Sequence, residues 1–151
     1  MSEIKVRHAT AAESSRIAAF NRAMAMETEG LALDEQTVAA GVVAVMGHPE
    51  RGFYLVAEVD GAVAGCLLIT YEWSDWRNKT FWWLQSVYVK PEHRCHGVYT
   101  ALDAKVRELA AEAGNVCGFR LYVHKDNLSA QVAYVNLGME KTNYVVFEEL
   151  T

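Results

Sequence analysis

The alternation of apolar and polar residues divides the first half of the chain into short elements. Residues 4–9 alternate with a period of two, which predicts a half-buried strand. Apolar residues at helical spacing then predict a first helix from a cap at Thr10 to about Met26. A second helix is expected over residues 38–46, with its end near Gly47.

The middle of the chain has the pattern of an antiparallel sheet. Residues 53–59 and 62–71 flank Asp60-Gly61, a dipeptide that favours a two-residue hairpin. Residues 81–89 are mostly aromatic or β-branched and predict a third strand in this part of the chain.

Helices and strands alternate in the last third. The spacing predicts a helix over residues 98–113, a strand over 119–123, a helix over 127–137 and a final strand over 144–149. This order of elements is that of an α/β (α+β layered) domain.

Length and composition limit the class of protein. A chain of 151 residues with 52% hydrophobic residues suits a single domain over residues 1–151. Its 14 basic residues against 19 acidic ones argue against a nucleic-acid partner. No apolar run approaches the ~18–20 residues of a membrane span, so no membrane association is expected. An N-terminus without a signal-peptide pattern and three cysteines without paired spacing favour a cytoplasmic location.

The segment between the strand 81–89 and the helix 98–113 concentrates basic residues. Its basic residues precede a helix N-terminus, where free backbone N–H groups favour phosphate, and Gly97 permits a close approach. These basic residues are Lys90, His93, Arg94 and His96. Arg-x-x-Gly alone also fits an ordinary strand-to-helix connection. The two histidines and Cys95 are too few for a zinc site, so no metal is expected.

Two motifs give this segment a family resemblance. Val-x-Pro-x-x-Arg-x-x-Gly-Val at 89–98 resembles motif A of the GNAT superfamily of acyl-CoA N-acyltransferases. Asn-x-x-Ala-x-x-x-Tyr-x-x-x-Gly-Met at 127–139 resembles its motif B. The resemblance implies the GNAT fold, a mixed sheet of about six or seven strands flanked by about four helices, and acetyl-CoA as co-substrate. Cys95 and Tyr99 depart from motif A, which usually has small residues there.

The resemblance also implies functional residues. Tyr134 would protonate the departing CoA thiolate, although its helical spacing also suits a core aromatic residue. The backbone of 87–89 would pair with the pantetheine arm, and amides of 95–100 would hold the pyrophosphate. The implied cofactor-binding residues are Val87, Tyr88, Val89, Arg94, Cys95, His96, Gly97, Val98, Tyr99, Thr100, Asn127, Ala130 and Tyr134.

The acceptor of the acyl group is expected to be a small cationic amine. A free alkylamine has a pKa of ~10.4 and must lose a proton before it attacks. Gln85, which cannot accept that proton, stands where related polyamine acetyltransferases often carry Glu. Glu27 and Glu29 lie in an acidic stretch that either binds the cation, with Trp73 adding an aromatic contact, or is a solvated loop. This part of the chain is loosely similar to the spermidine/spermine (diamine) acetyltransferase branch.

Other functions remain open at this point. The leading hypothesis is an acetyl-CoA-dependent N-acetyltransferase that passes an acetyl group directly to a primary amine. A protein N-terminal or lysine acetyltransferase and a non-catalytic acyl-CoA-binding module are the alternatives. A homodimer is expected from the family.

Overall fold

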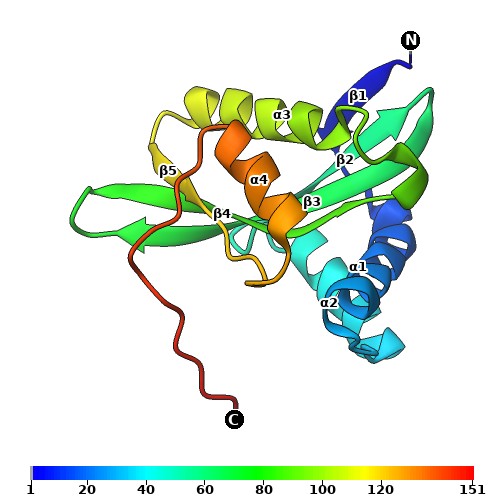
Figure 1. Cartoon of the computed structure of the whole chain (residues 1–151), viewed down its shortest axis with the longest axis horizontal. Coiled ribbons are helices and arrows are strands. Elements are labelled where there is room, and N and C mark those ends of the chain that lie inside the picture. The colour runs from blue at the N-terminus through cyan, green and yellow to red at the C-terminus, as the bar shows by residue number, and fades with distance from the viewer. Residues whose placement is uncertain (1) are drawn as a thin grey trace.

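Figure 1 shows the computed structural model of the chain, which describes residues 2–151. The sheet has five strands in the order β1-β2-β3-β4-β5. They are β1 (Ile4–His8), β2 (Phe53–Val59), β3 (Ala62–Ser74), β4 (Lys79–Val89) and β5 (Val116–Arg120). The helices of the described chain are α1 (Ser14–Glu29), α2 (Glu35–Met46), α3 (Val98–Ala113) and α4 (Leu128–Asn136), with short 3-10 turns η1 (Ala11–Glu13) and η2 (Pro91–His93).

The connections between strands follow from turn chemistry and chain length. Strands β1 to β4 pair antiparallel with their neighbours. Asp60 and Gly61 both have positive φ, 50° and 86°, which confirms the predicted hairpin. β4 and β5 pair in parallel, because α3 carries the chain back across the sheet between them.

Both faces of the sheet are covered by helices. On β2, Leu55 packs in the cluster that contains α3, whereas Val56 packs in the cluster that contains α1 and α2. Ile17 of α1 and Leu102 of α3 are fully buried in these two cores. The α/β layered fold class is therefore confirmed, with five strands instead of the expected six or seven.

Two strand predictions need correction. The segment 144–149, expected as the last strand, forms no strand. A strand requires a hydrogen-bonding neighbour, and the described residues supply none to this segment. The strand expected at 119–123 lies three residues earlier, because β4 pairs with Val116 to Arg120.

The first helix is longer than expected. α1 continues to Glu29 and ends at Gly30, which adopts a left-handed φ of 61°. Glu27 and Glu29 therefore belong to the last helical turn and do not lie in a loop.

Candidate functional site

A bulge bends β4 in the middle of the predicted cofactor stretch. Tyr88 pairs with Cys66 of β3. Gln85, three residues before Tyr88 on β4, pairs with Leu68, which is only two residues after Cys66 on β3. The extra residue on β4 gives Ser86 a φ of 51°. Such a bulge redirects the strand beyond it.

β4 also separates from β5 at this point. The two strands pair only from Thr80 to Trp83 on β4, up to Arg120 on β5. From residue 84 to Val89, the described chain provides no strand partner on this side of β4. An extended ligand can therefore pair with the free N–H and C=O groups of this edge, as an added strand would.

The loop before α3 presents unpaired backbone amides. Within the described residues, no N–H group from Cys95 to Thr100 donates a hydrogen bond; Ala101 is the first that does, to the carbonyl of Gly97 at 3.0 Å. Cys95 and Gly97 have φ values of 61° and 85°. These amides and the positive end of the α3 dipole form an arrangement that fits a pyrophosphate.

Arg94 connects this loop to two other elements. Its Nε donates to the carbonyl oxygen of Val89 at 2.8 Å, and an Nη donates to Glu27 of α1 at 2.8 Å. The guanidinium also lies 5.4 Å from the ring centre of Tyr88. Arg94, which is expected to bind phosphate, and Glu27, which is expected to bind the acceptor, thus form an ion pair. Direct contact of Arg94 with a phosphate stays a prediction.

Tyr134 lies on α4 opposite the first turn of α3. Its ring and that of Tyr99 are edge to face, with centroids 5.5 Å apart. Burial raises the pKa of both phenols, so Tyr134 keeps its proton at neutral pH, as a general acid must. The side chain of Asn127 accepts the Ala130 N–H at 3.3 Å, which gives this motif residue the role of helix cap.

The expected acceptor residues do not gather in one place. Glu27 and Glu29 lie at the end of α1, near Val89 at the C-terminal end of β4. Gln85 is halfway along β4, where its Nε2 donates to Thr70 at 2.6 Å. Trp73 on β3 pairs with Thr80 on β4. Thr80 is nine residues from Val89, a separation of about 30 Å along β4.

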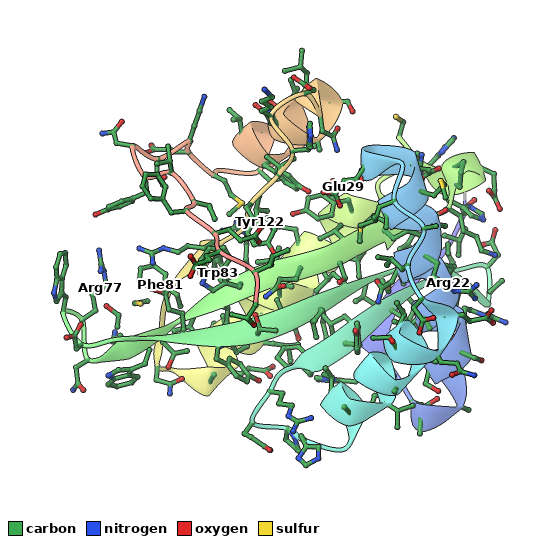
Figure 2. The ribbon with its side chains drawn as sticks, turned by 90° about the horizontal axis from the view of Figure 1, so that it is seen from below. Arg22, Glu29, Arg77, Phe81, Trp83 and Tyr122 are labelled. Atoms are coloured by element: carbon green, nitrogen blue, oxygen red, sulfur yellow. The ribbon has the colours of Figure 1, made fainter. Side chains whose placement is uncertain are left out.

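The far end of the β3–β4 hairpin has its own polar network. Glu72 accepts hydrogen bonds from Trp83 at 2.9 Å and from Arg120 at 2.8 Å, and these hold its pKa below the ordinary value. Figure 2 shows Arg77 and Phe81 at this end, opposite Arg22 of α1. Glu72 is thus already paired within the protein.

Sequence reasoning missed the residue that joins α3 to α4. Arg107 donates to Asp103 at 2.8 Å, and another of its nitrogens donates to the carbonyl oxygen of Leu137 at 3.0 Å. Asp103 is buried, and its spacing of four from Arg107 on one helix was the available signal. This contact ties the end of α4, and with it Tyr134, to α3.

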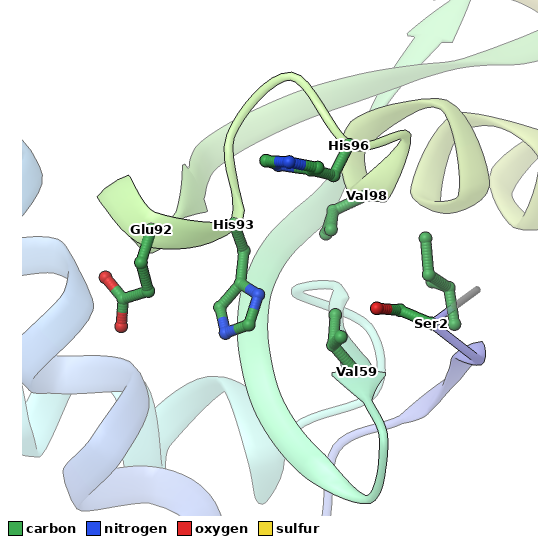
Figure 3. Close-up of a pocket in the computed structure, with 7 residues that line it drawn as sticks. Ser2, Val59, Glu92, His93, His96 and Val98 are labelled. Carbon is green, nitrogen blue, oxygen red and sulfur yellow. The ribbon is translucent and has the colours of Figure 1, made fainter.

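A small cavity of about 140 Å³ lies behind the loop. Figure 3 shows that His93, His96 and Val98 line it from the loop side, and Ser2 and Val59 from the other. Among residues 2–151, no three side chains of the metal-ligating types gather into a group. No helix in the same range is long and apolar enough to cross a membrane.

Comparisons with known proteins agree with this geometry. The acetyltransferase (GNAT) family profile matches residues 18–139. The thialysine N-epsilon-acetyltransferase of Bos taurus is 30% identical, covering 93% of this chain and 86% of its own. A possible acetyltransferase from Clostridium difficile 630 is 38% identical with a TM-score of 0.90, covering 98% of this chain and 97% of that one. A predicted acetyltransferase from Clostridium acetobutylicum, solved with acetyl-CoA, shares the fold at 15% identity and a TM-score of 0.80, over 97% and 96% of the two chains.

The chain belongs to the GNAT acetyltransferase family, and it is an N-acetyltransferase.

Proposed function

We propose that this chain transfers the acetyl group of acetyl-CoA directly to a primary amine of a small cationic molecule. The observation that carries the proposal is the meeting of three features where β4 leaves β5. These are the free strand edge up to Val89, the unpaired amides from Cys95 to Thr100, and the half-buried phenol of Tyr134, whose ring lies against that of Tyr99.

Each feature has a chemical task. The amides of residues 95–100 hold the pyrophosphate, and the edge of 87–89 orients the pantetheine arm. When bound, acetyl-CoA supplies an acetyl group activated as a thioester. The Val87 N–H polarises the thioester carbonyl, and Tyr134 gives its proton to the departing thiolate.

Charge supports a cationic acceptor. The chain has a net charge of −5, and the end of α1 contributes Glu27 and Glu29 beside the cofactor loop. In the free protein Glu27 is paired with Arg94, which leaves Glu29 as the carboxylate outside that ion pair. The Bos taurus relative is named for acetylation of thialysine, which is consistent with a small amine.

The decisive experiment compares Tyr134→Phe with wild type on a panel of diamines and thialysine. Loss of the general acid is expected to lower kcat by ~10²–10⁴-fold with little change in acetyl-CoA affinity, measured by calorimetry. Tyr71→Phe, a half-exposed tyrosine away from the β4 edge, is the matched control. An unchanged kcat in Tyr134→Phe would remove the residue from catalysis. Acetyl-CoA binding without turnover on any amine would favour a non-catalytic module.

The acceptor assignment has its own test. Glu29→Gln is expected to raise KM for cationic amines about fivefold, the equivalent of about 1 kcal/mol for an exposed charge pair, and to leave neutral amines unaffected. Glu112→Gln, exposed on α3, is the control. Equal effects on charged and neutral amines would contradict a cation site at the end of α1.

A further inference from the structure

The helix that carries Tyr134 has little support of its own. α4 contains no buried residue, and its large apolar side chains Leu128, Val132 and Val135 are between 58% and 67% exposed. After α4 the chain continues as the C-terminal segment, residues 140–151, which forms no helix or strand. A general acid must lie within hydrogen-bond reach of the atom that it protonates. The position of Tyr134 therefore depends on the contacts that join α4 to the rest of the molecule.

One face of α3 supplies such contacts. Tyr99, Asp103 and Arg107 follow one another at intervals of four residues, which places them on the same side of the helix. The ring of Tyr99 lies against that of Tyr134. Arg107 donates to the carbonyl oxygen of Leu137 at 3.0 Å, and a hydrogen bond of 2.8 Å ties it to Asp103. Because Tyr134 and Leu137 are three residues apart, this face of α3 holds one turn of α4, which lies beside it in Figure 1.

Tyr99 makes its contact with α4 through its ring. The centroids of the two tyrosine rings are 5.5 Å apart and their planes meet at 71°, which is the edge-to-face geometry that aromatic pairs prefer. The hydroxyl of Tyr99 is buried and has no hydrogen-bond partner among residues 2–151. Because a buried hydroxyl without a partner is unfavourable, the hydroxyl does not account for a tyrosine at this position. Motif A usually has a small residue here, and a small side chain could not reach Tyr134.

We propose that Tyr99 is a positioning residue for the general acid, and that its ring holds Tyr134 in the direction of the departing thiolate. The backbone N–H of Tyr99 stays free for the pyrophosphate, so the side chain and the backbone of one residue have separate tasks. A displacement of about 1 Å in a reacting group can lower the rate by about 10²-fold. The inference rests on the proposed function, because Tyr99 acts only through Tyr134.

The first test compares two variants of Tyr99. Tyr99→Ala removes the ring and keeps the amide, so kcat is expected to fall by about 10–100-fold while the Kd for acetyl-CoA, measured by calorimetry, stays within about threefold. Tyr99→Phe keeps the ring and loses only the unpaired hydroxyl, so it is expected to recover kcat to within about threefold of wild type. An unchanged kcat in Tyr99→Ala, or an equal loss in Tyr99→Phe, would overturn the proposal.

The matched control for this comparison is Tyr71→Ala. It removes another half-exposed aromatic ring, which lies near Phe53 and Trp82 and away from α4. Its kcat, measured well below its Tm, is expected to equal that of wild type. A loss of kcat in Tyr71→Ala as large as that in Tyr99→Ala would show that the loss follows from weaker packing in general, and it would contradict a specific role of Tyr99.

The second test asks whether Tyr99 acts through Tyr134. A double-mutant cycle combines Tyr99→Ala with Tyr134→Phe, which leaves no acid for the ring to position. In that background Tyr99→Ala is expected to change kcat by less than about twofold. A further loss of about 10–100-fold in the double variant would overturn the proposal, because Tyr99 would then affect another step. An unchanged kcat in Tyr134→Phe alone would remove the acid and this inference with it, so a failure of the proposed function is recognised separately.

The third test follows α4 without turnover. In the free protein, Tyr99→Ala is expected to speed hydrogen exchange of the α4 amides about fivefold and to leave the exchange of the sheet unchanged. Tyr99→Phe is expected to match wild type. Wild-type exchange of α4 in Tyr99→Ala would show that the ring does not hold the helix. An equal acceleration in α4 and in the sheet would show a general loss of stability, and either result would overturn the proposal.

Discussion

The two regions of this molecule, residues 2–110 and 111–151, are equally apolar in pattern but differ in packing. The first region contains every buried residue of the described chain. From residue 111 onward none is buried, although β5, α4 and the C-terminal segment contain many aromatic and aliphatic side chains. Hydrophobic sequence therefore makes a core only where a second layer covers it.

The difference separates stability from function. The first region supplies the rigid sheet, the bulge at Ser86 and the loop at Cys95. The second supplies Tyr134 on a helix held to α3 through Arg107. The proposed catalysis requires the two regions in a fixed relation, so a ligand bound between β4 and β5 is expected to stabilise the second region most.

The largest expected effect contrasts two leucines, one in each region. Leu102 is fully buried, and Leu102→Ala is expected to destabilise the chain by about 2–5 kcal/mol, or roughly 5–20 °C in Tm. Leu128 is 67% exposed, and Leu128→Ala is expected to cost under about 0.5 kcal/mol. Both changes are measured by thermal unfolding of the full chain. Similar losses at both positions would break the comparison.

The sequence predicted the first region well because its signals are local or periodic. The hairpin at Asp60-Gly61 requires two positive φ angles that this dipeptide tolerates, and the apolar spacing of α3 matches its buried face. The motif spacing also pointed to the loop after Arg94 as the expected phosphate site, and the backbone amides of this loop make no hydrogen bonds in the structure.

The remaining features depend on contacts between distant residues. The ion pair of Arg94 with Glu27 joins positions 67 residues apart, and no pattern along the chain indicates it. The segment 144–149 has a strand pattern, but a pattern states which residues suit a strand and not which edge receives them. The bulge at Ser86 depends on register with β3, which only the paired strands define.

An intermediate effect concerns the charges that anchor the first region. Arg7 of β1 binds Glu13 at 2.7 Å and Glu58 at 2.9 Å. The hydrogen bond from Arg7 lowers the pKa of Glu13 from 4.5 to about 2. A lowered pKa in the folded state means that the stabilisation is present above about pH 4.5 and is lost as the pH falls towards 2.

Glu13→Gln is therefore expected to destabilise the chain at neutral pH by at most about 3 kcal/mol and to flatten the loss of stability between pH 4.5 and 2. Urea unfolding at a series of pH values measures this. Glu112→Gln is the control, and a parallel pH dependence in Glu13→Gln and wild type would contradict the role of this pair.

The smallest expected effect lies at Cys95, in the loop of the first region between β4 and α3. Its φ of 61° is unfavourable for a residue with a side chain, at a cost of about 1–2 kcal/mol that glycine avoids. Because glycine also gains entropy in the unfolded chain, Cys95→Gly is expected to stabilise the protein by a net ~0.5–1 kcal/mol. Cys95→Ala removes the thiol but keeps the strain, so it separates the two causes. If Cys95→Gly raises Tm and leaves acetyl-CoA affinity within about twofold, the loop already holds its binding conformation in the free protein. Equal Tm values for the glycine and alanine variants would mean that the backbone at this position is not strained, and that the loop takes another conformation when the ligand is absent.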